Sequence, residues 1–172
     1  MQKAELNKSG GFTLLEILAV MVLIAIFIVL AVTQYSKSDV TLTSQTQVLK
    51  SHLRYAQMRS INTDTTWGIF YHHDNTTSYY YLFSDHNINN IEQLPGETRD
   101  RVDLGDMGIT IGSAVGATTP QTRSFQIEFD DWGRPSSTQL DATGTGSYTL
   151  ELYKVNNDAQ RFVVTRNTGF IQ

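Results

Sequence analysis

Few side chains in this sequence could perform chemistry, and their spacing does not fit the common catalytic or metal sites. The chain has four histidines and no cysteine, which excludes disulfides, thiol catalysis and cysteine metal sites. His72 and His73 are adjacent and precede Asp74, but neighbouring residues of a strand point to opposite faces and do not easily share one ion. A second acidic group consists of Asp100, Asp103 and Asp106. That spacing is not the spacing of a calcium loop, and the sequence contains no nucleophile elbow or glycine-rich phosphate loop. We therefore expect no catalytic residue, no metal ion, no cofactor and no enzyme activity.

The one charge that calls for an explanation is Glu16, because it lies inside a long apolar run. Residues 12–32 read FTLLEILAVMVLIAIFIVLAV, without glycine or proline. As a helix this run would be about 31 Å long, which matches a hydrocarbon core of about 30 Å. A carboxyl group in such a segment costs roughly 2.5 to 3.5 kcal/mol on insertion scales and calls for a partner. We therefore expect a membrane-spanning helix whose single acid meets a positive charge.

Three interpretations of this segment remain open from its residues: a plain membrane anchor, a secretory signal peptide, and a short cleaved leader followed by a packing helix. A signal peptide has an apolar region of about 7 to 15 residues followed by a small-residue cleavage site, and neither is present here. A plain anchor leaves Glu16 unexplained. Lys3 and Lys8 precede the run against Glu5, which favours an N-terminus in the cytoplasm and a body outside.

The string GGFTLLE at residues 10–16 resembles the processing site of type IV pilins and pseudopilins, which form bacterial pili and part of type II secretion systems. In that family an inner-membrane prepilin peptidase cuts after the glycine that corresponds to Gly11. The same enzyme then methylates the new N-terminal residue, which here would be Phe12. The resemblance thus implies that Gly11 and Phe12 flank a cleavage site and that Phe12 is N-methylated.

The resemblance also implies a role for Glu16 in subunit assembly. The family's glutamate at this position pairs with the α-ammonium of a neighbouring subunit inside the filament. Two opposite charges that meet in an apolar bundle cost less than either alone, and a subunit in the wrong axial register would leave both unpaired. The implied organisation is a leader over residues 1–11, a transmembrane and filament-core helix over residues 12–32, and a periplasmic body over residues 33–172.

The rest of the sequence predicts one continued helix and then a β-rich body. Leu42, Leu49, Leu53 and Ala56 recur at helical spacing, which predicts an amphipathic helix up to about Ile61. Beyond it the apolar spacing becomes strand-like. The predicted strands cover residues 67–71, 79–83, 109–111, 125–129, 148–155 and 162–165. Residues 86–95 and 114–123 are predicted to be exposed loops. These elements predict an α+β fold class, and the resemblance implies a type IV pilin-like fold with a long N-terminal helix packed on an antiparallel sheet.

Three further stretches, residues 49–60, 129–135 and 168–171, resemble the GspH/FimT group of minor pilins and pseudopilins. This resemblance implies a structural subunit of a type II secretion system or of a pilus. Its partners would be other pilins, the prepilin peptidase and the inner membrane. Which of the two machines the chain serves cannot be predicted from one sequence.

DNA binding is the alternative from a different functional class. Some members of the FimT branch bind DNA during transformation through a C-terminal motif of the form GRxR. The corresponding residues 169–172 read GFIQ and lack both arginines. Arg161 and Arg166 are the nearest cations, but acidic residues lie close to them in sequence, and the formal net charge of the chain is -4. A DNA partner is therefore disfavoured.

Overall fold

The computed structural model describes residues 13–113, 123–137, 140, 147–154 and 158–172, with the side chains of the first helix described at residues 13–29 and 40–63. Gly11 and Phe12 lie outside the described residues. The chain forms two compact units, Met1–Ser38 and Asp39–Gln172. The elements in order are α1 (Leu14–Thr63), β1 (Trp67–His73), β2 (Ser78–Ser84), β3 (Asn87–Glu92), β4 (Arg101–Asp103), η1 (Gly105–Met107), β5 (Ile109–Ser113), β6 (Phe125–Phe129), β7 (Pro135–Ser136), β8 (Ser147–Lys154) and β9 (Ala159–Thr165).

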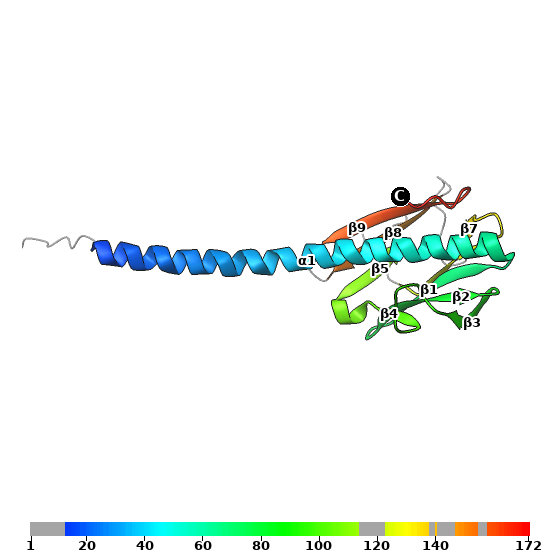
Figure 1. Ribbon diagram of the computed structural model, residues 1–172, viewed down its shortest axis with the longest axis horizontal. Helices are drawn as coiled ribbons and strands as arrows, with labels where there is room; N and C mark the ends of the chain where they lie inside the picture. Colours follow the sequence, from blue (N-terminus) through cyan, green and yellow to red (C-terminus); the bar gives the residue numbers. More distant parts are fainter. Residues whose placement is uncertain (1–12, 114–122, 138–139, 141–146, 155–157) are drawn as a thin grey trace, which may run out of the picture. The chain divides into compact units, whose positions relative to one another are not determined.

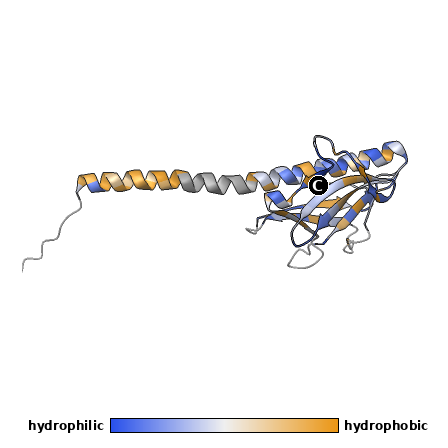
Figure 2. Ribbon diagram, turned by 90° about the horizontal axis from the view of Figure 1, so that it is seen from below, coloured by the Kyte–Doolittle hydropathy of each residue, from blue (hydrophilic) through white to orange (hydrophobic). Residues whose placement is uncertain are grey.

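The first unit contains the apolar part of α1. Every described side chain of residues 14–29 is exposed, and Figure 2 shows this stretch as almost uniformly hydrophobic. The exposed fractions of its large apolar side chains reach 83% at Leu14. Within the described residues, no helix is both long and apolar enough to cross a membrane. Residue 12 and the side chains of residues 30–32 belong to the predicted span and lie outside the described ones. The predicted span therefore stays a prediction.

The second unit packs the amphipathic part of α1 on two antiparallel sheets. The first sheet has the strand order β3-β2-β1-β6-β7, with β4 also paired to β2, and the second has the order β5-β8-β9. Leu49 and Leu53 of α1 meet Ile69 of the first sheet and Leu150 of the second around one small apolar cavity. The helix and both sheets therefore share a single hydrophobic core.

Two hydroxyl groups join the sheets where β5 approaches β1 and β2. The fully buried Tyr71 hydroxyl accepts a hydrogen bond from the Ile111 N–H at 2.9 Å. Ser78 lies 2.9 Å from the same hydroxyl and donates to the Ile109 carbonyl at 3.2 Å. The Ile109 N–H donates to the Leu104 carbonyl at 3.0 Å. These bonds satisfy backbone groups that β5 would otherwise bury without a partner.

The predicted fold class is confirmed, because a long N-terminal helix packs on antiparallel strands. All six predicted strands are present, and β6 has the predicted bounds. Helix α1 ends at Thr63, close to the predicted end at Ile61. Of the loop predicted over residues 114–123, residues 114–122 lie outside the described residues.

The loop predicted over residues 86–95 is wrong, because β3 occupies much of it. Strand β3 pairs with β2 across a tight turn at Asp85 and His86. Both turn residues have a positive φ, 58° and 57°. This is the backbone of the two-residue hairpin turn that asparagine and glycine usually signal. Asp85 suits the first position of such a turn, but His86 stands where glycine usually follows, so the sequence signal for this hairpin is weak.

Candidate assembly site and helix-end cluster

Helix α1 begins at a cap supplied by Thr13. The Glu16 N–H donates to the Thr13 carbonyl at 3.0 Å and lies 3.3 Å from the Thr13 hydroxyl oxygen. The Ile17 N–H also donates to the Thr13 carbonyl, at 3.2 Å. Threonine followed three residues later by glutamate is the sequence pattern of a capping box, and this signal could have located the helix start from the sequence. The motif thus fixes where the helix begins.

Glu16 lies in the first turn of α1 and is exposed. A carboxylate at this position interacts favourably with the positive end of the helix dipole. Residues 13–29 contain no other charged residue. A helix that is apolar on all sides has to be covered by lipid or by other helices. Glu16 is the one position in residues 13–29 where a covering group could place a cation beside a carboxylate. Its role in subunit assembly stays a prediction.

At the other end of α1, the three stretches that resemble the GspH/FimT group come together. The side-chain amide of Gln57 donates to the Gly133 carbonyl at 2.8 Å and to the Thr168 carbonyl at 3.3 Å. Arg54 donates to the Ile171 carbonyl at 3.0 Å. Residues far apart in sequence are thereby held against the helix. We call this set of contacts the helix-end cluster.

Two glycines make the helix-end cluster possible. Gly133 and Gly169 have φ values of 73° and 64°, which favour glycine. A Cβ atom at Gly133 would lie 2.8 Å from Cδ1 of Ile61, and one at Gly169 would overlap the Gly133 carbonyl and the Gln57 amide. Both backbones therefore approach the helix more closely than any other residue type would allow.

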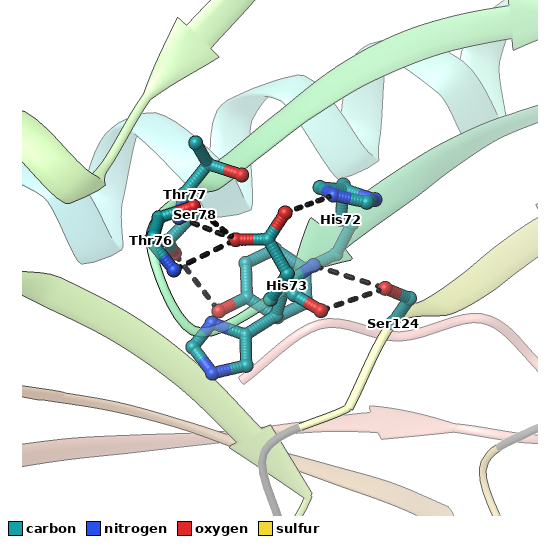
Figure 3. A network of polar contacts seen from close by, with 8 residues as sticks. His72, His73, Thr76, Thr77, Ser78 and Ser124 are labelled. Atoms are coloured by element: carbon teal, nitrogen blue, oxygen red, sulfur yellow. Dashed lines mark hydrogen bonds and ion pairs between the residues drawn. The ribbon is translucent and has the colours of Figure 1, made fainter.

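The histidine pair lies on opposite faces of β1, as the sequence predicts (Figure 3). His72 stacks on Tyr79 at 4.8 Å between ring centroids and bonds Asp74 at 3.2 Å. The His73 ring stacks instead on the buried Tyr71, and the backbone N–H of His73 donates to the Ser124 hydroxyl at 2.9 Å. The backbone N–H groups of Thr76 and Thr77 donate to the Asp74 carboxylate and hold the pKa of Asp74 well below its ordinary value. Within the part of the chain that the structure describes, no three His, Asp or Glu side chains could hold a metal ion together.

Two of the remaining charged candidates, Asp103 and Arg161, are engaged in ion pairs. Asp103 lies between Arg99, at 3.3 Å, and Arg101, at 3.0 Å. Arg161 pairs across the strands with Glu151 at 3.5 Å. Asp100 and Asp106 are exposed, whereas Asp103 is a half-buried strand residue with two arginine partners. Arg161 likewise does not present an uncompensated cation.

Comparison with known proteins identifies the N-terminal segment. Residues 6–32 match the family described as the prokaryotic N-terminal methylation motif. The body resembles the minor pseudopilin EpsH from the type 2 secretion system of Vibrio cholerae, with a TM-score of 0.50, 12% identity, and coverage of 76% of this chain and 94% of that one. The chain thus carries a prokaryotic N-terminal methylation motif and has a type IV pilin-like fold.

A second similar structure is the type IV minor pilin FimU of Pseudomonas aeruginosa, with a TM-score of 0.48, 12% identity, and coverage of 77% of the pilin-like chain and 87% of FimU. A comparison with curated protein sequences gives no match. At 12% identity the likeness to EpsH shows the fold alone.

Proposed function

We propose that this chain is a non-enzymatic minor pilin or pseudopilin that is incorporated into a pilus-like filament. The prepilin peptidase removes residues 1–11 and methylates Phe12. Before assembly the chain is a single-pass protein of the inner membrane, with its N-terminus in the cytoplasm and its body in the periplasm. The observation that carries the proposal is the methylation motif at residues 6–32 on a chain with a pilin-like body.

The exposure of the first part of α1 supports this function. Leu14, Met21 and Phe27 are 83%, 68% and 67% exposed, although each is strongly apolar. Exposed apolar surface of this extent marks an interaction site or a lipid contact. A subunit that moves from a membrane into a filament core would cover these side chains with lipid first and with neighbouring helices afterwards.

Mass spectrometry of the full chain, extracted from a host that has the peptidase, tests the processing step. We expect a chain that begins at N-methylated Phe12. Gly11→Ala should slow or block the cut, because glycine allows a close backbone approach to the peptidase. Gly10→Ala is the matched control and should still be processed at the same bond. An intact Met1 terminus in that host would overturn the proposal.

Co-purification distinguishes assembly from a solitary membrane protein. The wild-type chain should be recovered with at least one other pilin-like subunit from the host that encodes it. The DNA-uptake alternative predicts instead a salt-sensitive gel shift of DNA in the micromolar range. The pairing of Arg161 with Glu151 does not favour that outcome.

A further inference from the structure

An apolar patch lies beside the helix-end cluster. The described residues of the second unit include six large hydrophobic side chains that are exposed: Val40, Met58, Ile61, Ile91, Trp132 and Phe170. Four of them, Met58, Ile61, Trp132 and Phe170, belong to the segments that meet at the cluster. Their exposed fractions are 51%, 48%, 75% and 59%. We call these four residues the aromatic patch.

The segments that carry the four residues lie against one another. Gly133, which follows Trp132, lies so close to Ile61 that an added Cβ atom would be 2.8 Å from Cδ1 of Ile61. Gly169, which precedes Phe170, lies against the Gly133 carbonyl. Met58 is three residues before Ile61 and therefore on the same side of the helix. The four exposed side chains therefore stand on one helix end and two loops whose backbones lie close together.

The two aromatic residues stand on loops with well-bonded backbones. Asp130 accepts hydrogen bonds from the Trp132 N–H at 3.0 Å, from the Arg134 N–H at 2.8 Å and from the Arg134 side chain at 2.8 Å. On the other loop, the Thr165 N–H donates to the Phe170 carbonyl at 2.9 Å and the Gly169 N–H to the Thr165 carbonyl at 2.7 Å. Anchors fixed in this way lose little conformational freedom when a partner binds.

The charge around the aromatic patch differs from that of the rest of the body. Residues 39–172 contain 10 Lys and Arg residues against 15 Asp and Glu residues, a formal charge of -5. The three segments that carry the patch, residues 54–64, 130–134 and 165–171, contain four arginines and three aspartates. A partner that carries negative charge is repelled least by the part of an acidic body that has no excess of negative charge. The aromatic patch is such a place.

We propose that the aromatic patch docks another pilin-like subunit of the same filament through an apolar or weakly acidic face of that subunit. This inference rests on the proposed function and adds a contact outside the N-terminal helix. Tryptophan, phenylalanine, methionine and arginine are the residue types enriched at the centres of protein interfaces. A nucleic acid would require a clear excess of cations, which the three segments lack. A membrane would be reached through the apolar run, and Met58 comes 26 residues after its end at Val32.

The test uses the full chain, processed in its own host, with Trp132 and Phe170 both changed to serine. We expect recovery of other pilin-like subunits with this double variant to fall at least tenfold. Ile91→Ser is the matched control, because Ile91 is 47% exposed on the edge strand β3 and does not belong to the patch. It should leave recovery unchanged. Trp132→Tyr combined with wild-type Phe170 should retain most of the recovery, since an aromatic anchor remains.

Two further measurements separate the possible outcomes. Cleavage after Gly11 and protease resistance of the body should be the same in the double variant and in the wild type, which shows that processing and folding are intact. Unchanged recovery of partner subunits by that folded double variant would overturn the inference while leaving the proposed function in place. Failure of the wild-type chain to recover any pilin-like subunit would instead count against the proposed function. Salt-sensitive binding of single-stranded DNA that the double variant loses would assign the patch to nucleic acid and overturn the inference.

Discussion

The two described parts of helix α1 share one secondary structure and differ completely in burial. Residues 14–29 expose every side chain. Residues 40–63 bury a stripe that consists of Leu42, Thr46, Leu49, His52, Leu53, Ala56 and Ser60. The stripe finds its partners in the chain's own sheets, whereas the first part must find its partners outside the chain. The same helix therefore serves folding at one end and, in our proposal, assembly at the other.

The largest effect on assembly is expected for a substitution of Glu16. Glu16→Val should leave membrane insertion intact or improve it, because the substitution removes a carboxyl group that costs a few kcal/mol in an apolar environment, about 2.5 to 3.5 on insertion scales. Incorporation with other pilins should fall more than tenfold, because the α-ammonium of a neighbouring Phe12 would lose its partner. Co-purification from extracted membranes measures it. Asp100→Val, an exposed acid of the body, is the control and should assemble normally. Wild-type incorporation of Glu16→Val would refute the pairing.

Two leucine substitutions test whether the two parts of the helix contribute differently to the stability of the body. Leu53 is 1% exposed, and Leu53→Ala should lower the free energy of unfolding of the body by about 2 to 5 kcal/mol. Leu23 is 54% exposed, and Leu23→Ala should change the free energy of unfolding of the body by less than about 0.5 kcal/mol. Urea titration of the full chain in detergent, followed by tryptophan fluorescence, measures both. Equal effects would show that the two parts of the helix are not divided as described.

A smaller effect is expected where the hydroxyl groups join the sheets. Tyr71→Phe keeps the buried ring but removes the acceptor for the Ile111 N–H. The body should lose about 1 to 3 kcal/mol of stability, which is the usual cost of leaving a buried polar group without a partner. Tyr79→Phe on the neighbouring strand, where the side chain is half-buried, is the control. Thermal unfolding of the two variants side by side should rank them in this order.

The smallest expected effect is the dependence of body stability on pH through His52. This buried side chain lies 3.0 Å from the Tyr80 hydroxyl and 3.1 Å from the Pro95 carbonyl. Burial lowers the pKa of His52 below 6.5, although the Pro95 carbonyl and the Glu97 charge partly oppose the shift. The neutral ring is thus favoured in the folded state, so its contribution is fully present above pH 6.5 and is lost as the pH falls toward the lowered pKa. His52→Gln should flatten the stability profile between pH 7 and 5.

The sequence predicted the elements whose periodicity is local. Phe125, Ile127 and Phe129 alternate with polar residues, and β6 has the predicted bounds because one of its faces is buried. Strands β4 and β7 were missed because three and two residues are too few to show a period. The turn at Asp85 and His86 was missed because it uses neither asparagine nor glycine.

The candidate sites also differ in whether a local sequence pattern reveals them. The processing motif and Glu16 lie in one contiguous string and could be found by reading it. The contacts of Gln57 with Gly133 and Thr168 join residues 76 and 111 positions apart, and no local sequence pattern predicts such contacts. The aromatic patch depends on those contacts, so it became visible only once the backbone brought the three segments together.

The hydroxyl contacts on β5 also limit how copies of this protein can associate. A free strand edge presents unpaired N–H and carbonyl groups with which a strand of another chain can pair, and such pairing can start edge-to-edge aggregation. On the edge of β5 away from β8, the Ile111 N–H and both backbone groups of Ile109 already have partners. A foreign strand would have to displace them all. Growth of an ordered filament by strand exchange at this edge of β5 is therefore disfavoured.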